Sequence, residues 1–530
     1  MKTLIATVLI SALISPVFAQ DVPRRRPGSS DTAGTTGPRP TPGNSAVSQT
    51  RDAIARIERL NPRINAVTAV DPTALDQARA LDRAPTRGRL GGMPILIKDN
   101  IESKGPLPTT AGSLALANNV TGRDAPLVAR LRAAGAVIVG KTNLSEWANI
   151  RSNNSISGWS AVGGQVRNPH ALNRNACGSS SGSGAAVAAG MVPAAIGTET
   201  DGSVTCPAAV NGIVGFKPTV GLVSRTHVIP ISHSQDTPGP MTRTVRDAAL
   251  VLGAMAGSDP ADAQTREADA RRVDYAGQLS AQSLRGKRIG VMRFATGFGT
   301  DAAFAEALRT LQAQGAILVE IDKFEGRGEI GSNEFKVLLT ELKADLNAYL
   351  ATTPPQVKTR TLAQVIAFNN ANAQRELGLF GQETFVQAEM TKGLSDPDYV
   401  KARATSLRKA GVEGIDRLLR EHDVVALVGP TMSPAWLIDS VNGDQYAGGG
   451  AGGLAAVAGY PHLTVPMGLA KGMPVGLSFI GPKWADAQIL SLGYAYEQAS
   501  RKIVTPRFLP SIEEAEPVKS LFEPARATRR

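Results

Sequence analysis

The stretch that decides the fold is CGSSSGSGAAVAA, residues 177–189. Its first half consists of glycines and serines, and its second half, 185–189, consists of residues that favour a helix. A flexible linker would continue in glycine and serine, whereas this run passes directly into a helix. Residues 178–182 also match the G-x-S-x-G pattern, which places a nucleophile at Ser180 on a strand-to-helix turn. The preceding residues 165–176 read as a loop rather than as the required strand, so this match is weak.

A second segment of small residues is IGTETDGS at 196–203, after a strand-like stretch. Glycines and small side chains let successive backbone N–H groups converge on one point, where they stabilise a developing negative charge. Ser203 at the end of this segment is therefore a candidate nucleophile. A turn without chemistry is an equal interpretation of this segment taken alone.

A serine nucleophile needs a proton acceptor, and Lys98 is the candidate. It ends the segment MPILI at 93–97, which reads as a short apolar strand. Burial disfavours the ammonium form and lowers the pKa of a lysine, so that the neutral amine acts as a base. A solvated lysine, or one paired with Asp99, is the structural alternative. The five histidines lie in no metal-binding or paired helical motif, and we expect neither a metal nor a cofactor.

Three segments follow one another in the chain: GGMPILIKDN at 91–100, the run at 177–189, and GTETDGSVTCP at 197–207. In this order, and with this spacing between the two serine segments, they resemble the three core motifs of the amidase signature family. The detail is most similar to the bacterial peptide amidase branch. The wider resemblance runs over about residues 53–501.

The resemblance implies an amide hydrolase with a Ser203–Ser179–Lys98 relay. The residue matching Lys98 is the neutral base, and the residue matching Ser179 is a bridging serine that follows a cis peptide bond after Gly178. The residue matching Ser203 attacks the amide carbon to form an acyl-enzyme, which water then hydrolyses. The implied oxyanion hole consists of the backbone N–H groups of Thr200, Asp201, Gly202 and Ser203.

One position departs from the family pattern. Many relatives have two glycines before the nucleophile, whereas this chain has Asp201 and Gly202 before Ser203. A carboxylate there repels a substrate carboxylate and attracts an amide or a cation, and we hypothesise a preference for neutral C-terminal carboxamides. A structural role of Asp201 in capping the turn is the alternative. We expect Ser180 to support the site or the substrate.

Alternating helical and strand-like segments predict an α/β fold. We expect one large domain at 49–520, with a central mixed, largely parallel sheet covered by helices. The expected helices lie at 50–60, 124–131 with Asp124 as N-cap, 243–255, 302–312 and 485–500, with a largely helical block at 335–420. The expected strands lie at 93–97, 136–139, 289–292, 317–321, 424–428, 463–465 and 476–480.

The chain begins like an exported protein. Residues 1–19 have a basic start, an apolar run and small residues before the end, which is typical of a signal peptide cleaved after Ala19. Residues 20–48 are rich in proline, glycine and serine and predict a disordered tether. A basic tail is expected at 521–530. These features predict a periplasmic or secreted protein.

Composition excludes several classes of protein. The 530 residues are 42% hydrophobic and 19% charged, as in ordinary globular proteins. The net charge of +11 lies partly in the terminal segments and is otherwise dispersed, and aromatic residues are only 5%, so we expect no nucleic-acid partner. No apolar run is long enough for stable membrane insertion. Cys177 and Cys206 are either a disulfide or two buried thiols.

The sequence therefore predicts a secreted serine amidase that acts on peptide carboxamides or similar small amides and needs no partner protein. Within the family, the strongest rival is the catalytic component of a tRNA-dependent amidotransferase, and the export signal argues against it. An aryl-acylamidase or a fatty-amide hydrolase of the same family is a further alternative, because the pocket-lining block at 335–450 is the least readable part. An inactive ligand-binding protein on the same scaffold is the alternative from another class.

Overall fold

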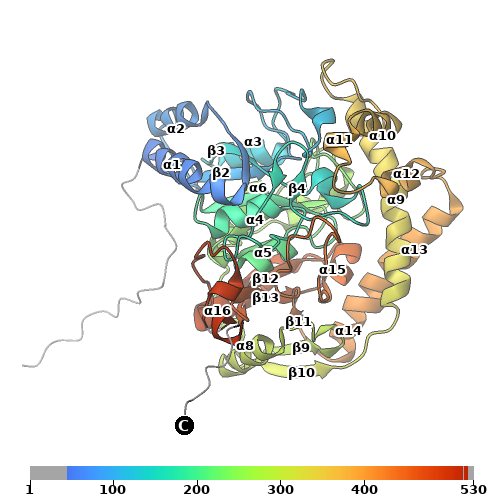
Figure 1. Cartoon of the computed structure of the whole chain (residues 1–530). Coiled ribbons are helices and arrows are strands. Elements are labelled where there is room, and N and C mark those ends of the chain that lie inside the picture. Colours follow the sequence, from blue (N-terminus) through green and yellow to red (C-terminus); the bar gives the residue numbers. More distant parts are fainter. Residues whose placement is uncertain (1–44, 517, 523–530) are drawn as a thin grey trace, which may run out of the picture. The chain divides into compact units, whose positions relative to one another are not determined.

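An 11-stranded mixed sheet organises the structure. This is a computed structural model that describes residues 45–516 and 518–522 (Figure 1). Across the sheet the strands are β1 (Val67–Val70), β3 (Val137–Thr142), β2 (Pro94–Lys98), β6 (Ala194–Glu199), β8 (Thr237–Thr242), β7 (Val214–Lys217), β12 (His462–Ala470), β13 (Met473–Ile480), β11 (Ala426–Pro430), β9 (Arg288–Met292) and β10 (Ile317–Ile321). A separate pair consists of β4 (Trp159–Ser160) and β5 (Gly164–Gln165).

The strand pairing confirms the expected mixed sheet. Parallel pairing joins β3, β2 and β6 in one block and β11, β9 and β10 in another. The other neighbouring strands of the described sheet are antiparallel. Parallel strand pairing is therefore confined to these two blocks, with antiparallel strands between them.

Side chains alternate along the strands and assign the helices to two faces. Ile95 and Ile97 of β2 belong to one core cluster, and Leu96 between them belongs to another. The first cluster includes helices α3 (Pro126–Ala133), α6 (Val245–Met255), α8 (Asp301–Ala313) and α16 (Asp486–Ser500). The second includes α1 (Ala46–Ile64), α2 (Ala74–Arg83), α4 (Ser181–Ala188) and α5 (Thr205–Asn211). Lys98 continues the register of Leu96 and so points to the face that carries α4 and α5.

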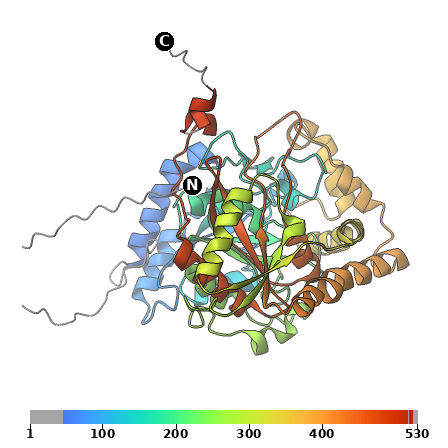
Figure 2. The same ribbon diagram turned by 90° about the horizontal axis from the view of Figure 1, so that it is seen from below.

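The expected helical block at 335–420 is confirmed. It consists of α9 (Arg327–Ala351), α10 (Leu362–Ala371), α11 (Ala373–Glu376), α12 (Glu383–Glu389), α13 (Pro397–Ala410) and α14 (Asp416–Glu421). In Figures 1 and 2 the yellow and orange helices α9–α13 lie together at one side of the strands. The remaining described helices are α7 (Ala268–Arg271), α15 (Gly452–Ala458) and α17 (Val518–Phe522). No described helix has the length and apolar character that a membrane span requires.

Gly182, in the first turn of α4, explains why this helix begins with glycines and serines. A Cβ atom at Gly182 would lie 2.2 Å from the carbonyl oxygen of Ala66 and 2.5 Å from that of Asn143. The backbone of α4 therefore touches the backbone of the neighbouring segments, which a side chain would prevent. The decisive run is a tightly packed helix start and not a flexible linker.

Three sequence expectations need correction. Helix α3 begins at Pro126 with Ala125 as N-cap, while Asp124 accepts hydrogen bonds from Lys104 N (2.6 Å) and Arg132 (3.1 Å) instead. Residues 46–48 of the expected tether belong to α1, because Asp82 accepts from the N–H groups of residues 46 and 47. Residues 521 and 522 of the expected tail belong to α17. The signal peptide and the rest of the tether and tail lie outside the described residues.

Candidate active site

Lys98 lies at the end of β2 and has no exposed surface. Its Nζ atom lies 2.7 Å from Ser179 Oγ, 2.8 Å from Thr198 Oγ1 and 3.3 Å from the carbonyl oxygen of Thr198. Asn100 Nδ2 donates to the same Thr198 Oγ1 at 3.0 Å. If Lys98 is neutral, its two N–H bonds go to the two oxygens of Thr198, and its lone pair is directed at the hydroxyl of Ser179.

The surroundings of Lys98 favour the neutral amine. Burial lowers its pKa from the ordinary value to about 7, although the negative charges of Asp236 and Glu199 act in the opposite direction. No carboxylate of the described residues forms a hydrogen bond with Nζ. A substantial fraction of Lys98 is therefore unprotonated at neutral pH, as general-base catalysis requires.

Ser179 has the backbone expected of the bridging serine. The peptide bond between Gly178 and Ser179 is cis, as the family resemblance implies. The side chain of Ser179 is fully buried against Lys98, and its carbonyl oxygen accepts from Ser145 N at 3.0 Å. The loop before α4 thus holds the Ser179 hydroxyl at the end of β2.

Ser180 connects the two serine segments. Its backbone N–H donates to the carbonyl oxygen of Ser203 at 3.1 Å. Its hydroxyl donates to the carbonyl oxygen of Thr198 at 3.1 Å and accepts from Thr198 N at 3.2 Å. The Ser180 hydroxyl is therefore buried and occupied by the backbone of β6. No described strand directly precedes Ser180, so the context of the G-x-S-x-G elbow is missing.

The side chain of Glu199 holds the turn that carries Ser203. The Glu199 carboxylate accepts from the N–H groups of Val204 (2.8 Å) and Thr205 (2.9 Å), the first residues after Ser203. Gly202 adopts a left-handed φ of 79°, which allows the sharp change of direction. In the described part of the chain no hydrogen-bond acceptor occupies the N–H groups of residues 200–203. These N–H groups are available for an oxyanion, although this role stays a prediction.

Asp201 in this turn and Glu334 on α9 interact electrostatically, and we call them the acid pair. Asp201 is exposed to solvent, yet the surrounding protein and the Glu199 carboxylate raise its pKa. Burial and the charge of Asp201 raise the pKa of Glu334 on α9. Gln235 Nε2 donates to Glu334 Oε1 at 2.8 Å and to the carbonyl oxygen of Thr200 at 3.2 Å. The raised pKa values mean that the acid pair retains a proton at a pH where isolated carboxyl groups are ionised.

A disulfide bond joins Cys177 and Cys206, which settles the alternative that the sequence left open. Cys177 precedes the loop of Ser179, and Cys206 lies in the first turn of α5 after Ser203. The disulfide therefore connects the two segments that carry the predicted catalytic serines.

The histidines form no metal-binding motif in the sequence. In the structure, however, His233 lies in a cluster with two carboxyl groups. His233 Nδ1 lies 2.9 Å from Asp345 Oδ2, and its Nε2 lies 3.2 Å from Glu341. These three residues are a group that could hold a metal ion. Arg403 Nε lies 3.6 Å from Glu341, and Tyr399 donates to it at 2.7 Å. With both ring nitrogens already paired to carboxylates, the geometry is that of an ion-pair network between α9, α13 and the loop before β8.

The structure thus brings Lys98, Ser179, Ser180 and Ser203 together, as the sequence predicts. Their individual roles stay predictions. Sequence reasoning missed four residues around them: Asn100, Thr198, Glu199 and Glu334. The first three lie inside the quoted motifs, where their polar side chains were the available signal. Glu334 lies on α9, and no local pattern marks it.

The chain is similar to amide-hydrolysing proteins over most of its length. The sequence model of the family described as Amidase matches residues 48–490. A probable amidase of Arabidopsis thaliana is 38% identical over 467 residues, which cover 86% of each chain. The X-ray structure of native peptide amidase from Stenotrophomonas maltophilia is 49% identical, with a TM-score of 0.83 over 88% of this chain and 96% of that one. One of the subunits of the glutamyl-tRNA(Gln) amidotransferase from Symbiobacterium thermophilum is 35% identical over 479 residues, which cover 86% of this chain and 94% of that protein.

Proposed function

This chain belongs to the Amidase family, and from that premise we propose that it hydrolyses C-terminal carboxamides of peptides to peptide acids and ammonia. As a member of the family it is a hydrolase of C–N amide bonds. The observation that carries the proposal is the buried Lys98 amine, 2.7 Å from Ser179 Oγ and next to the Ser203 turn. The likeness to peptide amidases supports a peptide as the acyl group.

In the proposed mechanism, Ser203 Oγ attacks the carbonyl carbon of the carboxamide. The Ser203 proton passes to Ser179, whose own proton passes to Lys98 Nζ. The carbonyl oxygen becomes an oxyanion, stabilised by the backbone N–H groups of residues 200–203. When the C–N bond breaks, the nitrogen takes a proton back through Ser179 and leaves as ammonia. Water then attacks the acyl-enzyme with the same groups as base, which releases the peptide acid and restores the Ser203 hydroxyl.

The acid pair supports selectivity for a neutral carboxamide. A partly protonated carboxyl pair both donates and accepts hydrogen bonds, which complements the N–H and C=O groups of an amide. The negative charge that remains on the acid pair repels the carboxylate of the product. We propose that this repulsion disfavours free peptide acids as ligands and promotes product release.

An ammonia-release screen tests the proposed function. Peptide amides, aliphatic amides and anilides are incubated with the enzyme, and ammonia or aniline is measured. We expect the highest kcat/KM for peptide amides, and no turnover by the Ser203→Ala variant. Turnover of anilides alone, or turnover that persists in Ser203→Ala, would contradict the proposal.

We also propose that the protein is exported, on the basis of the predicted signal peptide at 1–19. The Cys177–Cys206 disulfide supports this proposal, because disulfides persist mainly in oxidising compartments. Expression of the full chain in a Gram-negative bacterium, with fractionation and N-terminal sequencing, tests it. We expect a periplasmic or extracellular protein that starts at Gln20. A cytoplasmic protein that retains Met1 would overturn this proposal without affecting the amidase assignment.

A further inference from the structure

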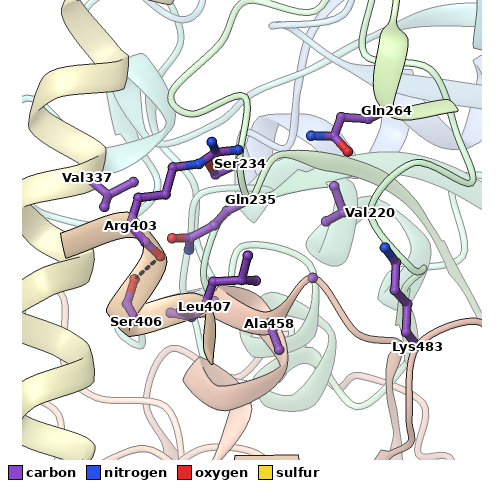
Figure 3. Close-up of a pocket in the computed structure, with 12 residues that line it drawn as sticks. Val220, Ser234, Gln235, Gln264, Val337, Arg403, Ser406, Leu407, Ala458 and Lys483 are labelled. Atoms are coloured by element: carbon purple, nitrogen blue, oxygen red, sulfur yellow. Dashed lines mark hydrogen bonds between the residues drawn. The ribbon is translucent and has the colours of Figure 1, made fainter. Parts of the chain in front are cut away.

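A small cleft lies between α9, α13, α15 and the loop that precedes β8 (Figure 3). Its volume is about 100 Å³, several times the roughly 10–15 Å³ that one buried water needs. Gln235 lines the cleft, and the amide of the same side chain donates to the carbonyl oxygen of Thr200 and to Glu334. One side chain therefore separates the cleft from the predicted catalytic turn.

The spacing of residues along α15 and α9 gives the distance between the cleft and the acid pair. On α15, a Cβ atom at Gly453 would lie 3.4 Å from the Asp201 carboxylate, and Val457, four residues later, lines the cleft. On α9, the charge of Asp201 contributes to the raised pKa of Glu334, and Val337, three residues later, lines the cleft. Residues three or four apart lie on one helix face, about 5 Å apart along the axis. The cleft therefore lies one helical turn from the acid pair, a distance that a peptide residue or two can span.

The charge of the cleft is opposite to that of the acid pair. Arg403 on α13 and Lys483 extend from different sides of it (Figure 3). Arg403 Nε donates to Ser234 Oγ at 2.7 Å and lies 3.6 Å from Glu341. In the described part of the chain, Nη1 and Nη2 of Arg403 and Nζ of Lys483 have no hydrogen-bond or ion-pair partner, although Lys483 lies over the ring of Trp484 at 5.3 Å. Two cationic side chains thus line the same cleft.

The remaining lining suits an amphipathic anion. Val220, Val337 and Leu407 provide apolar surface for methylene groups, while Ser234, Gln235 and Gln264 provide polar side chains. Guanidinium and ammonium groups are donors only and match the acceptor oxygens of a carboxylate. A glutamate or aspartate side chain has both parts, a short apolar stem and a carboxylate.

We propose that this cleft is a subsite for an acidic side chain in the acyl part of the peptide amide, one or two residues before the residue whose carboxamide is cleaved. This inference rests on the proposed function and adds a specificity that the function does not contain. The acid pair and the basic cleft together form two adjacent regions of opposite charge. An acidic peptide is therefore fixed in register, with its neutral carboxamide at the acid pair and its carboxylate at Arg403 and Lys483.

A peptide series tests the subsite in two ways. Acetylated tripeptide amides carry Glu, Gln or Lys one or two residues before a constant C-terminal leucine amide. Values of kcat/KM are measured with the wild-type enzyme, and Kd values are measured by calorimetry with Ser203→Ala, so that binding is tested without turnover. At one of the two positions we expect Glu to exceed Gln by about threefold to tenfold in both measurements, and Lys to be the poorest.

Charge substitutions assign the preference to the cleft. Lys483→Gln should lower the Glu-to-Gln ratio, and Lys483→Glu should make the Lys peptide better than the Glu peptide. Lys323→Gln, an exposed lysine in the segment before α9, is the matched control and should keep the wild-type ratio. Arg403 is less suitable as a first variant, because it also contacts Ser234 and Glu341.

The outcomes separate this inference from the proposed function. If no peptide amide is hydrolysed but Glu peptides still bind preferentially through Lys483, the proposed function fails and the subsite stands. If neutral peptide amides are hydrolysed and Glu gives no advantage at either position, the subsite is overturned. It is likewise overturned if no peptide of the series binds, or if Lys483→Glu and Lys323→Gln give the same ratios.

Discussion

In the proposed relay, Lys98 takes the place of the histidine that many hydrolases use as the base. The amine is buried at a strand end, which lowers its pKa to about 7, and two oxygens of Thr198 accept from it. In the neutral form of Lys98, this leaves the lone pair of the amine directed at Ser179 Oγ. Ser180 has a different function at the residue level, because both partners of its hydroxyl are backbone atoms of Thr198.

Single substitutions should separate these roles. Ser203→Ala and Lys98→Ala should each lower kcat/KM for a peptide amide by about a thousandfold or more, because each removes a group that the proposed relay requires. Ser180→Ala should keep measurable activity, since it removes only the two supporting hydrogen bonds to the backbone of Thr198. Thermal unfolding of each variant serves as the control for folding. Complete loss of activity in Ser180→Ala alone would instead assign the nucleophile to Ser180.

The pH dependence of activity should report Lys98. With a neutral peptide amide, kcat/KM should rise about tenfold per pH unit at low pH and level off above about pH 7, as Lys98 loses its proton. The acid pair also titrates with raised pKa values. Glu334→Gln is therefore the control and should retain the acid limb. A limb that disappears in this variant would show that the acid pair, not Lys98, governs the profile.

At the scale of elements, the site depends on how closely α4 and α5 are held to the sheet. The sequence predicts this in part. Local motifs contain Lys98, Ser179 and Ser203, so the relay is readable along the chain. Strand β8 was missed because Pro238 and Pro240 normally argue against an interior strand. In the structure they nevertheless lie opposite Thr198 and Ile196 of β6. A Cβ atom at Gly239 would lie 2.2 Å from the carbonyl oxygen of Phe216. Close packing against the neighbouring backbone therefore accompanies this strand, although its residue preferences do not predict it.

Loss of the disulfide should loosen both serine segments. Substitution of both Cys177 and Cys206 by alanine should lower the free energy of unfolding by about 3–4 kcal/mol, given the sequence separation of 29 residues. Urea unfolding measures this change. Since the chain has two cysteines, treatment of the wild-type protein with a reductant should reproduce the effect. An unchanged unfolding midpoint in both experiments would contradict a stabilising role.

The contact at the start of α4 predicts a steric effect. Gly182→Ala should lower the free energy of unfolding by about 1–3 kcal/mol, because backbone oxygens occupy the position of the new Cβ. Activity should fall as well, since Ser179 and Ser180 lie directly before this turn. Gly331→Ala on α9 is the matched control: no atom lies within 4 Å of its Cβ position, and alanine should stabilise that helix by up to about 1 kcal/mol. Equal unfolding midpoints for the two variants would disprove the close contact.

At the scale of the whole molecule, helices far along the chain complete the site built by the first half. The acid pair and the proposed subsite both require α9, and the subsite also requires α13 and α15. Glu334 and Arg403 could not be predicted as site residues, because only tertiary packing brings them to Gln235 and no local pattern marks them. The helical character of 335–420 was predictable from residue preference, whereas its position against the sheet was not.

The ion-pair network of His233 should make the attachment of these helices depend on pH. Hydrogen bonding to Asp345, with the charge of Glu341, raises the pKa of His233, although Arg403 and burial oppose this. Because the folded pKa lies above the unfolded value of about 6.5, the stabilisation is fully present below that pH and is lost as pH rises through the folded pKa. Wild-type stability should therefore decline over this interval relative to His233→Gln, as measured by thermal unfolding. Parallel pH profiles for the two proteins would contradict the assignment.

The complete burial of Lys98 also determines which atoms of the active site a covalent inhibitor can address. Ser179 and Thr198 surround the amine, and no part of its surface reaches solvent. An electrophile designed for nucleophilic lysines finds only surface amines that take no part in the proposed reaction. Ser203 retains a small accessible surface. Reagents that mimic an acyl group should therefore be designed to react with the hydroxyl oxygen of Ser203. Burial thereby protects the amine that we propose as the base from direct reaction with electrophiles.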